Sequence, residues 1–143
     1  MSSQITAVCI SENKGERKTP VDQVTLVEDH GIKDDAHAGP WHRQISLLAK
    51  ESIDKMRAMG LDVDNGDFAE NLTTEGIVLV DLPIGSQLRI NDCLLEITQI
   101  GKECHTRCAI YHQAGDCVMP KEGIFAKVLQ GGVISPGDQI EKL

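Results

Sequence analysis

Short runs of apolar residues, either alternating with polar residues or continuous, recur along the whole chain and predict β-strands. Alternation places every second side chain on one face of a strand, and a continuous short run fits a strand that is buried on both faces. Asn91 and Asp92 separate two such runs and are typical of a hairpin turn. The predicted strands are ITAVCI (5–10), QVTLVED (23–29), RQISLL (43–48), LPIGSQLRI (82–90) and CLLEITQI (93–100).

One segment has helical periodicity. In AKESIDKMRAMG (49–60), the apolar residues Ile53, Met56 and Met59 recur at every third position, and Gly60 can end the helix. We expect Met56 and Met59 to belong to the core.

The segments between these elements are rich in turn-forming and charged residues. ENKGERK (12–18) is predicted to be an exposed loop, and GIKDDAHAGPWH (31–42) has the composition of turns. LDVDNGDFAENLTTEG (61–76) is predicted to be loop with a short strand. GIFAKVLQGGVI (123–134) is apolar with two glycines at a bend, and SPGDQIEKL (135–143) adds a turn and a last strand.

Six to eight short strands with glycine-rich corners and one or two helices predict a mainly β fold, a closed or nearly closed β-barrel. A β-sandwich is the alternative. The sequence has no strand–helix alternation and no GxGxxG motif, which argues against a dinucleotide-binding fold. No repeat or linker divides it, so we expect a single domain over residues 1–143. Because aromatic residues are scarce, the core must consist mainly of Val, Ile and Leu.

Charge and composition exclude several classes of function. The net charge is −8, which would repel a phosphate backbone, so no nucleic acid partner is expected. The chain opens MSSQITAV and has no long apolar run, so we expect neither a signal peptide nor a membrane span, and hence a cytoplasmic location. Thiols stay mostly reduced there, and five cysteines is an odd number, so a disulfide scaffold is not expected.

The cysteines and histidines are concentrated in one stretch. Residues 101–117 read GKECHTRCAIYHQAGDC and hold three of the five cysteines and two of the five histidines. The spacing C-x3-C-x8-C lacks the paired knuckles of a structural zinc site and is not a standard iron–sulfur spacing, so both metal readings are minority options. A disulfide between Cys104 and Cys108 would be a redox event.

Cys104 is a candidate reactive thiol. It follows the end of a predicted strand, and nearby cations lower the pKa of a thiol and raise the thiolate population. The alternative is a small buried hydrophobe, which is what we expect of Cys9 and Cys93 inside predicted strands. The cations near Cys104 are Lys102, His105 and Arg107.

Four stretches, in order, resemble the MOSC domain family, which is named after the C-terminal part of molybdenum cofactor sulfurases. GIKDDAHAGPWHRQISLL (31–48) resembles its Gly-x3-Asp-x-His-x-Gly loop and following strand, and GDFAENLTTEGIVLVDLPIGSQLRI (66–90) resembles its Gly-Asp-x-x-Glu-Asn-Leu-Thr-Thr signature. LEITQIGKEC (95–104) is similar to its strand-then-cysteine element, and EGIFAKVLQGGVISPGDQI (122–140) to its closing segment. The chain resembles a small stand-alone bacterial-type member.

The resemblance implies a barrel-like β fold, the molybdenum cofactor (molybdopterin) as cofactor, and sulfur handling at Cys104. In the family this cysteine carries sulfur as a persulfide or ligates molybdenum directly. The pyridoxal phosphate of the large sulfurases belongs to a separate domain and is not expected in this chain. The sulfur donor would then be another protein, a cysteine desulfurase or a protein of molybdenum cofactor biosynthesis.

The sequence departs from the family pattern around this cysteine. Glu103 precedes Cys104 where many members have proline, and three further residues can serve as accessory thiols or ligands. These are Cys108, His112 and Cys117.

Three hypotheses about function follow. The first is a sulfur carrier or sulfurtransferase that uses Cys104 as a persulfide to deliver sulfur to a metal–sulfur centre. The second is a molybdenum-cofactor-binding reductase of N-hydroxylated compounds, with Cys104 as the molybdenum ligand. The third is a non-catalytic module that binds the cofactor or a metal.

The remaining candidate site residues are cationic or polar. His37 and Arg43 either bind anionic groups of the pterin ligand or tie down a turn, and Asp35 is expected to order the loop. The other candidate ligand-binding residues are Glu70, Asn71, Lys102 and Arg107. The side chains of the Glu-Asn-Leu-Thr-Thr signature (70–74) could instead cap a loop. This alternative to ligand binding is favoured for Thr73 and Thr74.

Overall fold

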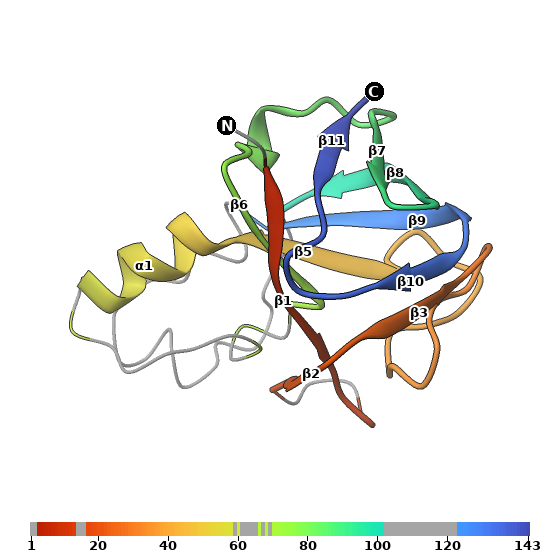
Figure 1. The fold of residues 1–143 in the computed structure, drawn as a ribbon, viewed down its shortest axis with the longest axis horizontal. Coiled ribbons are helices and arrows are strands. Elements are labelled where there is room, and N and C mark those ends of the chain that lie inside the picture. The colour runs from red at the N-terminus through yellow and green to blue at the C-terminus, as the bar shows by residue number, and fades with distance from the viewer. Residues whose placement is uncertain are drawn as a thin grey trace.

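The computed structural model describes residues 3–13, 17–58, 60, 66, 68, 70–101 and 123–143. Short strands dominate this part of the chain, and one helix lies at the side of the sheet (Figure 1). The elements, in order, are β1 (Gln4–Ile10), β2 (Thr19–Val21), β3 (Val24–Val27), β4 (Gly31–Ile32), β5 (Ile45–Ala49), α1 (Lys50–Ala58), β6 (Leu72–Glu75), the 3-10 helix η1 (Leu79–Asp81), β7 (Gln87–Ile90), β8 (Cys93–Ile100), β9 (Ile124–Gln130), β10 (Gly132–Ile134) and β11 (Ile140–Lys142).

Most strands belong to one strongly curled sheet. Eight of the described strands pair in the order β11-β7-β8-β9-β5-β6-β1-β2, and β10-β3-β4 form a second, small sheet. The large sheet curls until β1 meets the segment before β11. Ile5 N donates to Asp138 O at 2.8 Å, Gly137 N donates to Ile5 O at 2.7 Å, and Gln4 bridges Gln139. The mainly β, nearly closed barrel is therefore confirmed, and the sandwich alternative is not adopted.

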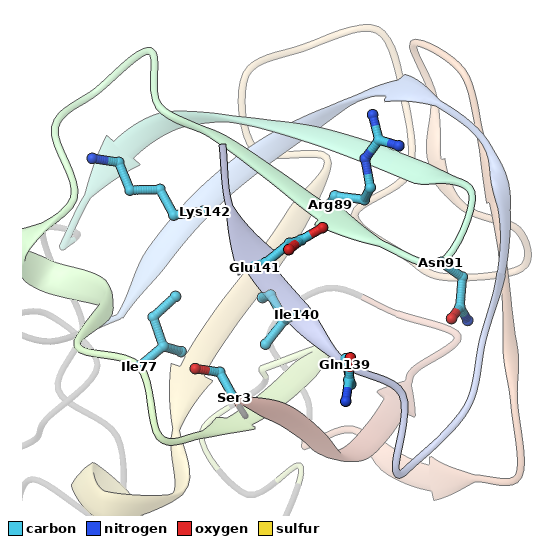
Figure 2. Close-up of a pocket in the computed structure, with 8 residues that line it drawn as sticks. All are labelled: Ser3, Ile77, Arg89, Asn91, Gln139, Ile140, Glu141 and Lys142. Carbon is cyan, nitrogen blue, oxygen red and sulfur yellow. The ribbon is translucent and has the colours of Figure 1, made fainter. Parts of the chain in front are cut away.

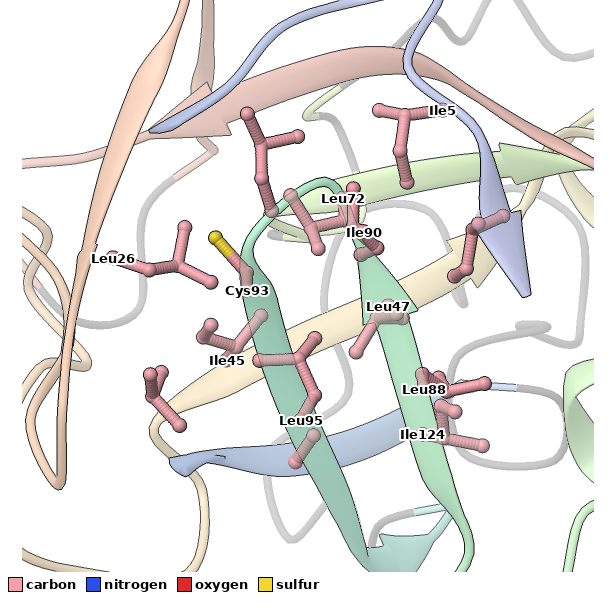
Figure 3. Close-up of a cluster of buried hydrophobic side chains, with 14 of the residues drawn as sticks. Ile5, Leu26, Ile45, Leu47, Leu72, Leu88, Ile90, Cys93, Leu95 and Ile124 are labelled. Atoms are coloured by element: carbon pink, nitrogen blue, oxygen red, sulfur yellow. The ribbon is translucent and has the colours of Figure 1, made fainter. Parts of the chain in front are cut away.

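The interior of the sheet is aliphatic, as the scarcity of aromatic residues predicts. Apart from Ala49, Ala126 and Cys93, every buried residue in the main core cluster is Val, Ile or Leu (Figure 3). The central strand β5 is buried at all five positions, because β6 and β9 flank it and both of its faces are covered.

The predicted helix follows β5 directly. Ile53 and Met56 of α1 are buried, as the apolar spacing predicts, and Ser52 lies beside them. Gly60 N donates to Arg57 O at 2.9 Å with a φ of +93°, which is the conformation expected of a glycine after a helix. Met59 lies outside the described residues.

Two expectations about the strands need correction. The structure has eleven strands in its described part, against the six to eight expected. The predicted strand 82–90 begins only at Gln87, because Gly85 adopts a φ of +93° and its N–H bonds to Ile97 O. The hairpin at Asn91-Asp92 is confirmed, with Asn91 at a φ of +53° between β7 and β8.

In the part of the chain that the structure describes, no helix has the length and apolar content needed to cross a membrane.

Candidate functional site

The first motif loop, residues 31–43, is anchored to the end of β1 by the buried carboxylate of Asp35. Its Oδ1 accepts a hydrogen bond from Ser11 N at 3.1 Å, and its Oδ2 accepts one from His37 N at 3.1 Å. Both bonds order backbone, so the loop-ordering role expected of Asp35 is confirmed.

The carboxylate of Asp35 is neutralised by Lys18. The Lys18 side chain is fully buried, and its Nζ lies 2.8 Å from Asp35 Oδ1, 3.0 Å from Ser11 Oγ and 3.0 Å from His37 Nδ1. The prediction of an exposed loop over 12–18 is therefore wrong at its last residue. Lys18 is one cation in a charged run, and the sequence holds no signal that separates it from its neighbours.

The second motif, which begins at Gly66, contacts the backbone of Lys18. Gly66 O accepts a hydrogen bond from Lys18 N at 2.8 Å, and Gly66 has a φ of +89°. A Cβ at this position would lie 1.9 Å from Lys18 O, so only glycine fits. Lys18 thus links the two motifs.

Glu70 organises the second motif from within. Its Oε2 accepts from Gly66 N at 2.9 Å, and its Oε1 accepts from Phe68 N at 3.2 Å. Burial raises the pKa of the Glu70 carboxyl, and the hydrogen bonds from Gly66, Phe68 and Thr73 oppose this. Both oxygens are used within this segment; a ligand-binding role for Glu70 stays a prediction.

Asn71, directly before β6, is hydrogen-bonded to two other strands, β5 and β1. Its Oδ1 accepts from Ser46 N of β5 at 3.0 Å, and its Nδ2 donates to Cys9 O of β1 at 3.1 Å. The amide of this candidate ligand-binding residue is thus bonded to the backbone of neighbouring strands, and its ligand-binding role stays a prediction. Thr73 and Thr74, expected to cap a loop, are instead buried in β6.

The end of the first motif loop carries a row of rings. The rings of His37 and Trp41 are stacked, with centroids 6.4 Å apart and planes 4° apart. Trp41 Nε1 donates to His37 O at 2.7 Å, and His42 meets the Trp41 ring edge-on at 5.7 Å. These contacts fix the orientation of the His37 ring.

Arg43 continues this row toward the end of β8. Its Nε donates to Gln99 Oε1 at 3.1 Å, and its guanidinium lies 5.2 Å from the centre of the Phe125 ring. His42 Nε2 reaches the same Gln99 oxygen at 3.1 Å. Among the residues that the structure describes, no carboxylate pairs with Arg43.

Gln99 also marks the place where the cysteine stretch leaves the sheet. Its Nε2 donates to Gly101 O at 2.8 Å, and Gly101 N donates to Gly123 O at 2.6 Å. Gly101 and Gly123, which flank the segment 102–122, are thus linked to Arg43 through Gln99. The candidates Lys102, Cys104, Arg107, Cys108, His112 and Cys117 lie in this segment, outside the described residues.

Cys9 and Cys93 are buried, as predicted for core cysteines. Burial raises the pKa of the Cys93 thiol to about 11, with Asp92 and Asp138 adding to the effect. Within the described ranges, no group of three or more His, Cys, Asp or Glu side chains could hold a metal ion.

A cavity of about 580 Å³ lies beside the paired strands β7 and β11, and none of the predicted site residues that the structure describes line it (Figure 2). It is lined by Ser3, Ile77, Arg89, Asn91, Gln139, Ile140, Glu141 and Lys142.

Comparison with known proteins identifies the family. The family model described as the MOSC domain matches residues 34–141. The chain belongs to the MOSC domain family. A comparison with curated proteins finds no match. This family is associated with the molybdenum cofactor.

Solved structures share the fold. YuaD from Bacillus subtilis superposes with a TM-score of 0.82 at 19% identity, covering 99% of this chain and 96% of that one. YiiM from Geobacillus stearothermophilus gives a TM-score of 0.72 at 23% identity, covering 99% and 75%. YiiM from Escherichia coli gives 0.69 at 18% identity, covering 100% and 70%. The resemblance to a small MOSC member is thereby confirmed.

The described residues fit the anionic part of this cofactor. Arg43 offers its remaining guanidinium N–H groups, and arginine suits phosphate and oxo groups because its donors form a planar fork. The described cysteines fit the metal less well, since both are buried in the core. Any sulfur ligand to molybdenum would come from outside the described residues.

Proposed function

We propose that this chain binds the molybdenum cofactor beside Arg43 and carries sulfur on Cys104 as a persulfide. The observation that carries the proposal is the position of Arg43. It is a half-buried guanidinium with no carboxylate partner in the described part of the chain, and it is held by Gln99 next to Gly101. Cys104 follows Gly101 by three residues in the sequence.

Arg43 is suited to an anion because no carboxylate among the described residues neutralises it. The bond to Gln99 is to a neutral amide, and the Phe125 ring supports the guanidinium while leaving its charge in place. The overall charge of −8 opposes anion binding, so local cations must hold the ligand. Outside the described residues, Lys102 and Arg107 would add their charges to that of Arg43, and His37 would add a hydrogen-bond donor.

The sulfur chemistry requires two exchange steps. In the first, the Cys104 thiolate attacks the terminal sulfur of a desulfurase persulfide. The new S–S bond forms on Cys104, the old one breaks, and the desulfurase thiolate leaves with the electron pair. In the second, the thiolate of Cys108 or Cys117 attacks Cys104 Sγ, which forms a disulfide and releases hydrosulfide for the acceptor.

The cofactor, when bound, supplies the metal centre that receives sulfur. The residues of this chain bind its anionic groups and present the thiol. Molybdenum retained stoichiometrically without any persulfide would instead favour the reductase function, in which Cys104 is a permanent ligand.

Two experiments test the proposal. Molybdenum is measured in Arg43→Gln and in wild-type protein purified from a host that makes the cofactor. Losing a charge-assisted hydrogen bond of about 1.5–3 kcal/mol lowers affinity by roughly ten- to a hundredfold. Arg89→Gln, which removes an exposed arginine on β7, is the matched control. Equal molybdenum in Arg43→Gln and in Arg89→Gln would refute binding at Arg43.

The second experiment tests the thiol. Intact protein is treated with a cysteine desulfurase and labelled with a persulfide-selective reagent. Wild type is expected to label and Cys104→Ala is not. If Cys104→Ala labels as strongly as wild type, the persulfide assignment is abandoned.

A further inference from the structure

The three polar contacts of Lys18 account for the whole ammonium group. Its Nζ lies 3.0 Å from Ser11 Oγ, 2.8 Å from Asp35 Oδ1 and 3.0 Å from His37 Nδ1. An ammonium has three N–H donors and no acceptor, so each donor faces one of these atoms. The contact with His37 therefore requires a lone pair on Nδ1.

The proton between the two nitrogens belongs to Lys18. The ordinary pKa of lysine lies about four units above that of histidine. Asp35 Oδ1, at 2.8 Å, accepts another N–H of the same ammonium, and both side chains are excluded from solvent. A protonated Nδ1 would point its N–H at an ammonium that has no acceptor.

Asp35 does not compete for a proton on the ring. The distance from His37 Nδ1 to Asp35 Oδ2 is 3.9 Å, which is too long for a hydrogen bond. That oxygen already accepts from His37 N at 3.1 Å. Two charged groups of the described residues lie against the ring, and they act differently: Lys18 bonds Nδ1, and Asp35 holds the backbone.

We propose that Lys18 is a positioning residue that holds the imidazole of His37 as its neutral Nε2–H tautomer. The ring then offers a hydrogen-bond donor at Nε2 to an oxygen of an anionic ligand. Trp41 fixes the plane of the ring by stacking on it. The ligand part of the inference rests on the proposed function, since His37 and Arg43 share one loop; the tautomer does not.

Nitrogen NMR of the histidine rings tests the tautomer in the ligand-free wild-type protein. Ring-labelled protein is studied at neutral pH, and the signals of His37 are assigned by their absence in His37→Gln. The expected result is a protonated Nε2 and a pyridine-like Nδ1. A protonated Nδ1, or the averaged shifts of two exchanging tautomers, overturns the proposal. His30, which is exposed, provides the reference for a solvated ring.

Lys18→Met tests the cause of the tautomer preference. The share of Nδ1–H at His37 is expected to rise, and an unchanged Nε2–H tautomer in the folded variant overturns the role of Lys18. If the variant does not fold, the wild-type spectrum still decides whether Nδ1 accepts. Molybdenum retention by His37→Gln is measured separately and is expected to fall several-fold. Retention equal to wild type overturns the ligand part, whereas wild-type protein without molybdenum counts against the proposed function.

Discussion

Lys18 Nζ and Asp35 Oδ1 lie 2.8 Å apart, and both side chains are completely shielded from solvent. Taking two charges out of water costs several kcal/mol per ion, which is recovered only when the pair and its hydrogen bonds are complete. Here Ser11 and His37 supply the remaining hydrogen bonds of the Lys18 ammonium and the Asp35 carboxylate. Losing one partner leaves the other charge buried and unpaired.

Lys18→Met is therefore expected to lower the free energy of unfolding by about 3–5 kcal/mol, as measured by urea denaturation. The matched control is Lys50→Met, which removes an exposed lysine that pairs with Asp54 at 3.1 Å on α1. An exposed pair of this kind contributes about 0.2–1 kcal/mol. Equal losses in the two variants would show that the buried pair has no special role.

Gly66→Ala is expected to destabilise the protein more than Gly85→Ala. The two glycines have similar φ angles, +89° and +93°, so an alanine at either position bears a similar backbone strain of about 1–2 kcal/mol. Of the two, only a Cβ at Gly66 would meet a backbone atom, Lys18 O at 1.9 Å. A Cβ at Gly85 would have no atom within 4 Å beyond its chain neighbours. Thermal and urea unfolding measure the difference. Equal stability of the two variants would contradict the close approach of Gly66 to Lys18.

Glu70 should make stability depend on pH. Because burial raises its pKa above the ordinary 4.5, the folded protein holds this proton more firmly than the unfolded chain. Its contribution to the free energy of unfolding is therefore fully present below pH 4.5. This contribution is lost as the pH rises through the raised pKa of the folded state. Urea denaturation of wild type and Glu70→Gln from about pH 4.5 to about pH 8 measures this difference. Wild type is expected to lose stability relative to Glu70→Gln as the pH rises. A gain in relative stability with rising pH would contradict the raised pKa of Glu70.

Cys93 should resist alkylation in the native protein. With a pKa of about 11, roughly one molecule in a thousand carries the thiolate at pH 8, and the side chain is buried. Mass spectrometry after iodoacetamide treatment is expected to find Cys93 unmodified without denaturant and modified in urea. Rapid native modification would contradict its burial.

The hydrophobic pattern was sufficient for the fold because most strands bury one face or both. The aliphatic core, the helix after β5 and the hairpin at Asn91 all follow from local patterns. The extent of the predicted strand 82–90 was wrong, because a glycine turn looks apolar in sequence.

The site was predictable only in part. His37 and Arg43 are candidates because of their motif, and their ligand-binding roles stay predictions. The pairing that buries Lys18 joins residues 17 positions apart in sequence. A lysine in a charged run gives no sign that a carboxylate will meet it after folding. Likewise, no sequence pattern shows that the amide of Asn71 is used to join strands.

The most direct measurement of the central claim is joint analysis of molybdenum and sulfane sulfur in protein purified anaerobically from a host that makes the cofactor. The account predicts both in wild-type protein, loss of the sulfane sulfur in Cys104→Ala, and loss of molybdenum in Arg43→Gln. Wild-type protein that contains neither, or sulfane sulfur that persists in Cys104→Ala, would contradict it.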